Sequence, residues 1–225
     1  MTGAPLIDWL PRSNAINLLA GVFLLSALYA VTQRRTAACI TAYTWNSLSL
    51  AAIAMLVALL TGARHIGVAA ALVLVSKGFL IPRLLRRALA RSRSRAEAEP
   101  YVSIQLSALL CGALVVIAFS QTRVLFGEGV SILASCLPVS IATTLVGLFL
   151  MVSRKQALAM VVGLVILENA IFLAAVSLTY GMPLVVEMGV LLDLLVGTAL
   201  LGMMVGRIEE SFATDDATRL TSLRG

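Results

Sequence analysis

The sequence predicts an all-α polytopic membrane protein with about seven transmembrane helices, an outside N-terminus and a cytoplasmic C-terminus. Three observations lead there. Of the 225 residues, 60% are hydrophobic and 12% are charged, whereas soluble domains are about 45–50% apolar and roughly 25% charged. Seven apolar stretches approach the length of about 20 residues that a spanning helix needs. The basic residues are concentrated in alternate loops, as in membrane proteins of fixed orientation.

The predicted spans follow one another through short connections. They cover residues 15–32, 37–60, 66–88, 101–119, 133–152, 157–179 and 184–206. Pro82 interrupts the inner half of the third span, where a proline can kink a helix. A change of composition over 120–132 divides the chain into an N-terminal four-helix half, 1–120, and a C-terminal three-helix half, 121–225. The N-terminal stretch lacks the basic start of a signal peptide, so we expect it to be retained.

The orientation follows from the positions of lysine and arginine. Thirteen of the seventeen basic residues lie in one set of loops and three in the other, and Lys77 lies inside a span. The larger set should face the cytoplasm. Within it, 83–95 carries six arginines but no aromatic residues between two spans. This segment indicates a topology signal, with contact to anionic lipids or an acidic partner, rather than a nucleic-acid site.

Residues that could hold a metal or cofactor are scattered. Cys39, Cys111 and Cys136 lie far apart, and His65 is the one histidine in the sequence. Zinc and iron–sulfur centres need clustered ligands. We therefore expect no cofactor in this chain.

Two acids interrupt the last two apolar runs: Glu168 in "GLVILENAIFLAAV" and Asp193 in "VLLDLLVGTALL". The turn "TYGMP" makes these runs an antiparallel hairpin. The rise of about 1.5 Å per residue then places both acids roughly 17–20 Å below the outer surface, near mid-membrane. Lys77 and Asn46 fall at a comparable depth in the third and second spans. The sequence therefore predicts a buried polar layer of four residues facing other helices or internal water.

Two interpretations of this layer compete. In one, Lys77 neutralises an acid and fixes the register of the helices. In the other, the residues form an ion path, because an acid that moves between an apolar environment and one beside a lysine can take up and release a proton. Two acids and one base at one depth favour the second interpretation. Glu187, at the outer start of the last span, is a further candidate for the path, although an acid in a first turn also complements the helix dipole.

Several motifs resemble those of a known family. The stretch 157–225, with "LENA", "LLDLLVG" and a terminal "LRG", resembles hydrogenase-4 component E of formate hydrogenlyase-type and other group 4 nickel–iron hydrogenase complexes. That resemblance extends to the N-terminal spans, including "SKGFLIP". Residues 130–225 are also similar to the K subunit of bacterial complex I and the C subunit of Mrp antiporters. Asp193 matches the third-span acid of that K subunit, whereas its second-span acid falls on Val165, one helical turn before Glu168.

The resemblance implies a multi-pass subunit of the bacterial inner membrane with no bond chemistry of its own. It would contribute Glu168, Asp193, Lys77 and Asn46 to a mid-membrane proton or sodium path. Its neighbours would be antiporter-like subunits and membrane lipids, and soluble nickel–iron and iron–sulfur subunits would carry out the redox chemistry. Two alternatives are a subunit of a cation/proton antiporter without redox partners and a structural spacer whose charges are locked in pairs.

Overall fold

The computed structural model describes residues 10–62, 64–91, 100–126, 136–179 and 197, which contain helices and no strand. The elements are α1 (Leu10–Thr32), α2 (Thr36–Thr61), α3 (Arg64–Val73), the π-helical segment η2 (Leu74–Leu80), α4 (Ile81–Arg91), α5 (Ile104–Phe126), α6 (Cys136–Ser153) and α7 (Ala157–Thr179). The all-α prediction is confirmed for these ranges.

Five helices in the described ranges are long and apolar enough to cross a membrane. They match the predicted spans 15–32, 37–60, 101–119, 133–152 and 157–179, and the fourth predicted span extends as a helix further along the sequence than expected, to Phe126. The predicted span 66–88 is helical, but it is divided into α3, η2 and α4, and α4 is rich in arginine. The span 184–206 lies outside the described residues. The count of seven therefore stays a prediction.

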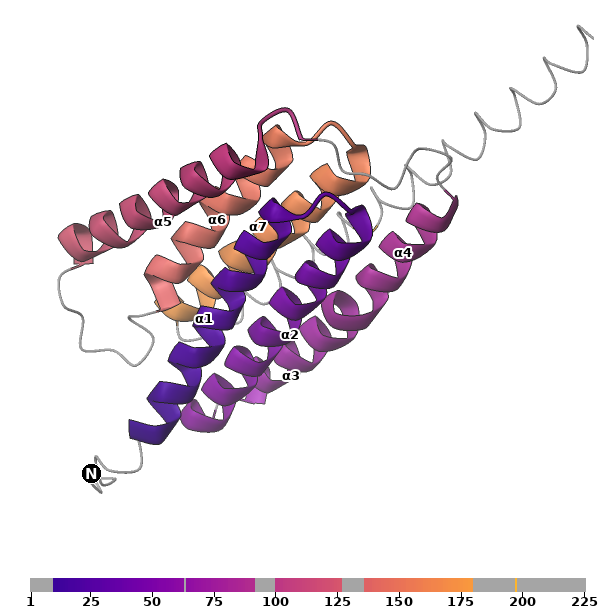
Figure 1. Cartoon of the computed structure of the whole chain (residues 1–225). Coiled ribbons are helices and arrows are strands. Elements are labelled where there is room, and N and C mark those ends of the chain that lie inside the picture. Colours follow the sequence, from indigo (N-terminus) through magenta and orange to yellow (C-terminus); the bar gives the residue numbers. More distant parts are fainter. Residues whose placement is uncertain (1–9, 63, 92–99, 127–135, 180–196, 198–225) are drawn as a thin grey trace, which may run out of the picture.

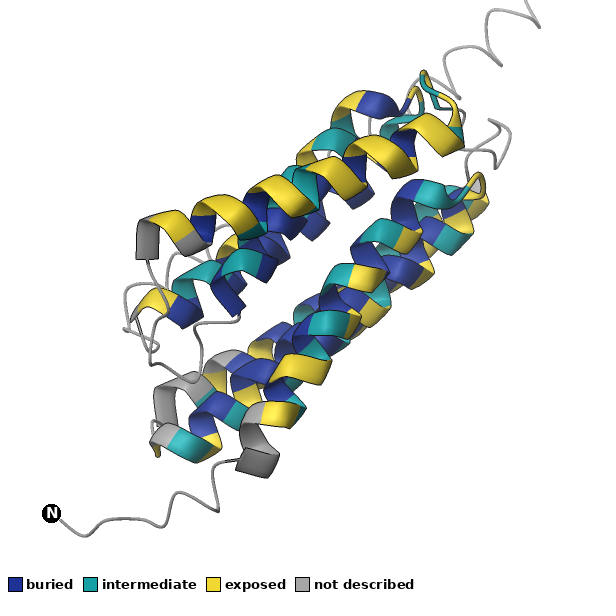
Figure 2. Ribbon diagram, turned by 60° about the vertical axis from the view of Figure 1, so that its left-hand side comes forward, coloured by how far each residue is buried: buried dark blue, intermediate teal, exposed yellow. Residues whose placement is uncertain are grey.

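Helices α1, α2, α6 and α7 pack side by side as the centre of the bundle (Figure 1). Helix α7 packs against α6 and α2, and the helix formed by α3, η2 and α4 lies along α2. Helix α5 packs on α6 and α1 and turns a largely exposed face outward (Figure 2). Exposed apolar side chains on that face include Leu109, Val116 and Ile117. An apolar exterior is what a lipid-facing or subunit-facing helix requires.

The crossing of α6 and α7 is unusually close because it is built on two glycines. A Cβ atom at Gly163 would lie 2.8 Å from the backbone nitrogen of Met151, and one at Gly147 would lie 2.9 Å from that of Leu167. Small residues let helix backbones approach in this way in membrane proteins. Gly163 on α7 and Gly147 on α6 thus form the two sides of this close contact.

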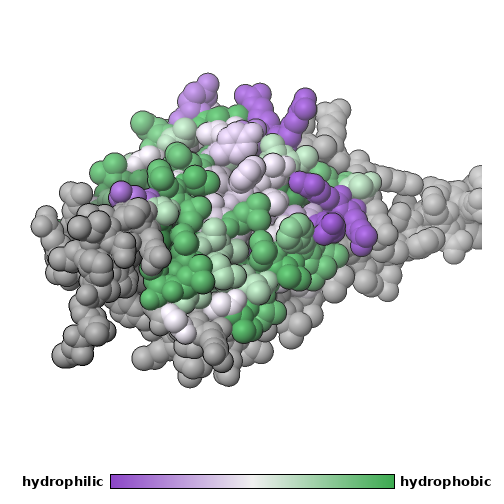
Figure 3. Space-filling view, turned by 90° about the horizontal axis from the view of Figure 1, so that it is seen from below, coloured by the Kyte–Doolittle hydropathy of each residue, from purple (hydrophilic) through white to green (hydrophobic). Residues whose placement is uncertain are grey.

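Basic loops meet at one end of the bundle. The α1–α2 turn carries Arg34 and Arg35, and the α6–α7 turn carries Arg154 and Lys155; both lie at the upper right in Figure 1, near the end of α4. The face seen in Figure 3 is mostly apolar, with hydrophilic residues towards its edges. This distribution agrees with the predicted grouping of the loops, while the side of the membrane on which the basic end lies stays a prediction.

Candidate functional site

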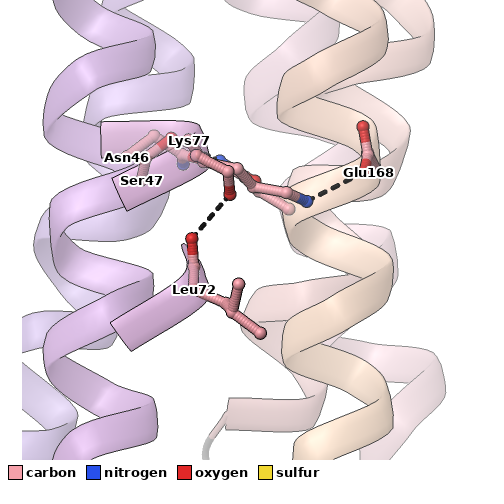
Figure 4. A network of polar contacts seen from close by, with 7 residues as sticks. Asn46, Ser47, Leu72, Lys77 and Glu168 are labelled. Carbon is pink, nitrogen blue, oxygen red and sulfur yellow. Dashed lines mark hydrogen bonds and ion pairs between the residues drawn. The ribbon is translucent and has the colours of Figure 1, made fainter. Parts of the chain in front are cut away.

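A buried ion pair lies about halfway along the bundle. Lys77, in the middle of η2, places its Nζ 2.9 Å from Oε1 of Glu168 on α7, and their side chains are 1% and 2% exposed (Figure 4). The Phe172 ring, one turn along α7 from Glu168, also lies near the ammonium, with its centroid 5.9 Å from Nζ. Because neither charge reaches bulk solvent, each depends on the other for its stability in the apolar interior.

A chain of side-chain hydrogen bonds joins three helices beside this pair. Asn169, the residue after Glu168, donates from Nδ2 to Asn46 Oδ1 and to Ser47 Oγ on α2, each at 2.9 Å. Asn46 in turn donates from Nδ2 to the carbonyl oxygen of Phe23 on α1, also at 2.9 Å. All three polar side chains are buried. In the described part of the chain Oδ1 of Asn169 accepts no hydrogen bond, so the layer retains an acceptor at its centre.

The backbone around Lys77 departs from the α-helix. The amide of Ile81 bonds to the carbonyl of Ser76, five residues back, as in a π-helix. The proline that comes next, Pro82, has no amide hydrogen and its ring would crowd the carbonyl four residues back in an α-helix. Wider turns of this kind accommodate prolines in membrane helices and are frequent at functional sites. The kink predicted at Pro82 takes the form of this π segment.

A second polar contact set fastens the basic end. Arg154 is 2% exposed, and its Nη2 donates to the carbonyl oxygens of Ala30, at 3.4 Å, and Val31, at the C-terminus of α1. Burial lowers the pKa of this guanidinium from its ordinary value, and the neighbouring Cys39 opposes that shift. An arginine still keeps its proton. The arginine adds a donor to carbonyls at the end of α1, where intrahelical donors run out, so it fixes the α6–α7 turn on α1.

The structure therefore brings together three of the five predicted path residues. Lys77 and Glu168 are in direct contact, and Asn46 joins their layer through Asn169. Asp193 and Glu187 lie outside the described residues. Sequence reasoning missed Asn169 and Ser47, although each is adjacent to a residue that it singled out. It also missed Arg154 as a buried group, because an arginine in a loop gives no sequence signal of burial.

The described residues hold no group of three histidine, cysteine, aspartate or glutamate side chains that could bind a metal. The three cysteines are buried and apart from one another. Within the described ranges, the chemistry of the site is thus that of one carboxylate, one ammonium and a set of amides and hydroxyls. Such groups can bind and transfer protons or bind a small cation.

Fold and site define a multi-span helical membrane protein with an ion pair buried between its helices. The chain belongs to the hydrogenase-4 component E family. It is 23% identical to hydrogenase-4 component E of Escherichia coli K12 over 213 residues, which are 95% of this chain and 99% of that protein, and the same holds for the Shigella flexneri protein. An uncharacterized protein of Mycobacterium tuberculosis is 30% identical over 94% of this chain and 97% of its own length.

No family model matches the sequence, and no solved structure matches the chain. The similarity of residues 130–225 to the complex I and Mrp subunits stays a prediction. The match to component E, by contrast, runs through both halves of the chain and covers nearly all of its length.

Proposed function

We propose that this chain is a membrane subunit of a hydrogenase-type complex in the bacterial inner membrane and that its buried charges form part of an ion path. The observation that carries the proposal is the Lys77–Glu168 pair, 2.9 Å apart and sealed from solvent. Two further observations support the proposal. Relatives of this chain are named hydrogenase-4 component E, and its apolar helices have the composition of membrane spans. Redox chemistry belongs to partner subunits, and antiporter-like subunits would continue the path.

The pair can act as a relay because the charge on Glu168 decides whether Lys77 is held beside it. A proton arriving at Glu168 removes the charge that holds the Lys77 ammonium, and departure of the proton restores the attraction. The neighbouring amides of Asn46 and Asn169 and the Ser47 hydroxyl offer hydrogen bonds to a transferred proton or water molecule. In this proposal Asp193, which the sequence places at the same depth on the next span, is the second carboxylate of the path.

The 2.9 Å pair also supports a second candidate function, a structural spacer. A buried pair fixes helix register whether or not it titrates, and removal of one partner leaves an uncompensated charge. A spacer role needs the pair intact at all times, whereas a relay needs it to open. The two candidates therefore predict different outcomes when Glu168 loses its charge but keeps its shape.

The test is ion translocation by the assembled complex in native membrane vesicles. Glu168→Gln and Asp193→Asn retain size and hydrogen bonding but cannot titrate. Each should leave the complex assembled and able to reduce or oxidise artificial carriers at its soluble sites, while ion translocation is lost. Glu128→Gln, an acid in the predicted connection at 120–132, is the control and should translocate normally. Normal translocation in both Glu168→Gln and Asp193→Asn would refute the path.

A further inference from the structure

We infer that Pro82 is a positioning residue for the ion pair: by favouring the π segment that precedes it, it sets the helix register that brings Lys77 to Glu168. The inference rests on the proposed function only for what the pair does. The placement itself follows from packing and backbone geometry, and it can be measured separately.

One row of buried positions in this helix advances by four residues at every step, slightly more than one α-helical turn. Val73, Lys77, Ile81 and Leu85 are all at most 4% exposed and are spaced four residues apart. An α-helix turns about 100° per residue, so each four-residue step overshoots a full turn by about 40°. From Val73 to Ile81 the overshoot would reach about 80°. The wider turn of η2, with its hydrogen bond from Ile81 to the Ser76 carbonyl, absorbs that drift and keeps Lys77 in line with Ile81.

Pro82 makes the wide turn the favoured one. In an α-helix its ring would crowd the Gly78 carbonyl and leave that carbonyl without its amide donor. Removing the proline abolishes this penalty, so the segment gains access to the regular α form. One flanking helix must then rotate relative to the other. Rotation of α4 would carry its exposed arginines into the apolar contact with α2 and α7, so the rotation falls on the part of the helix with Lys77. The ammonium then turns away from α7.

Substitution of Gly78 is a second, independent way to shift this segment between its π and α forms. A Cβ atom there would meet Cδ1 of Leu74 at 3.5 Å and Cδ2 of Leu48 at 3.8 Å, which are ordinary contacts. Gly78→Ala therefore fits the folded protein. Alanine favours a regular α-helix over the freer glycine backbone, so it should shift the segment in the same direction as removal of the proline, but less far.

The experiment compares Pro82→Ala with Pro138→Ala in the full complex in native membranes. Pro138 lies in the first turn of α6, where a proline is tolerated because no amide donor is needed. Helix register is read by cross-linking of Lys77→Cys with Glu168→Cys, the two positions of the ion pair, with a short bifunctional thiol reagent and the native cysteines replaced. Ion translocation per electron turnover is measured in membranes that contain the same variants without the added cysteines.

We expect Pro82→Ala to lose most of the cross-link and to reduce translocation severalfold while turnover with artificial carriers continues. Pro138→Ala should match the parent.

The outcomes separate this inference from the proposed function. If Glu168→Gln abolishes translocation but Pro82→Ala keeps both the cross-link and translocation, the positioning role is wrong and the ion path stands. If Glu168→Gln leaves translocation unchanged while Pro82→Ala loses the cross-link, the positioning role stands and the path fails. Absence of the cross-link in the parent would overturn the register itself. Should Pro82→Ala fail to assemble, Gly78→Ala decides: a smaller loss of translocation supports the inference, and unchanged translocation overturns it.

Discussion

The two helices that carry the ion pair are built differently. Helix α7, with Glu168, is regular over its 23 residues and touches α6 backbone to backbone at Gly163. The helix with Lys77 changes from α to π and back, and its glycines have room around them: the nearest atom to a Cβ at Gly67 would be 3.8 Å away. Its outer side exposes Val75, Phe79 and Leu80. The acid is thus held by a closely packed helix pair, while the base lies on an adjustable helix at the side of the bundle.

This contrast assigns the two partners different tasks. Asn169 and the α6 crossing fix the rotation of α7, so Glu168 is a stationary site. If the pair opens, the movement belongs to Lys77, whose backbone turn has an alternative hydrogen-bonding pattern and whose side chain is long and flexible. Substitutions that loosen α7 should therefore damage assembly, and substitutions in the Lys77 helix should affect function more than assembly.

The largest effect should come from adding side chain at the α6–α7 crossing. Gly163→Val places atoms inside the contact distance of the Met151 backbone and the Gly147 carbonyl, which cannot retreat without parting the helices. We expect a loss of about 3 kcal/mol or more, at the upper end for overpacking, seen as strongly reduced yield of complex and a lower midpoint temperature in detergent. Gly112→Ala on α5, where no atom lies within 4 Å, is the control. A normal yield with Gly163→Val would show that α7 is not held in this way.

An intermediate effect should come from removal of the amide that ties α7 to α2. Asn169→Leu deletes the donor to Asn46 and Ser47 and leaves two buried acceptors without it. Interhelical hydrogen bonds in membrane proteins contribute about 0.6–2 kcal/mol, so we expect a loss of about 1–2 kcal/mol in thermal unfolding of the complex. The double variant Asn169→Asp, Asn46→Asp would place two carboxylates where the amides pair. It should lower the stability of the complex more than Asn169→Leu does. Equal stability of Asn169→Leu and the parent would mean that the α6 crossing alone holds α7.

The smallest effect is expected in the helix that carries Lys77. Gly67→Ala adds a methyl group where there is room, with Cβ of Ala58 3.8 Å away. Alanine is the better helix former by about 0.5–1 kcal/mol, so the midpoint temperature should be unchanged or slightly raised. A marked drop would show that α3 packs as tightly as α7 and would remove the contrast between the two helices.

The depth of the charged residues in the bundle is predictable from the sequence. The rise per residue of a helix is fixed, so depth can be counted along the chain, and Lys77 and Glu168 do lie at one level. Which helices become neighbours is a packing outcome, so the sequence alone left open whether Glu168 or Asp193 partners Lys77. The structure gives Glu168, while Asp193 lies outside the described residues.

The π segment and the amide layer were not predicted. A span is expected to be regular, and Pro82 suggested only a kink. The four-residue steps from Val73 to Leu85 exceed the 3.6 residues of an α-helical turn only slightly. Spacings of three and four are normal on an α-helical face, so this pattern alone did not reveal the π segment. Asn169 was passed over beside Glu168 because an amide in an apolar run is far less conspicuous than a charge. Its two hydrogen bonds depend on the rotation of α7, which the glycine crossing sets.

The most direct measurement of the central claim is a comparison of Glu168→Gln, Lys77→Met and the double variant for assembly and ion translocation. If Glu168 is a titrating site, Glu168→Gln assembles, keeps its redox turnover with artificial carriers and does not translocate ions, and adding Lys77→Met restores nothing. A purely structural pair predicts the reverse. Glu168→Gln would then leave a buried ammonium without its partner and lower the stability of the assembled complex by about 3–5 kcal/mol. The double variant would regain both the yield of complex and ion translocation. Recovery of translocation in that double variant would contradict the relay.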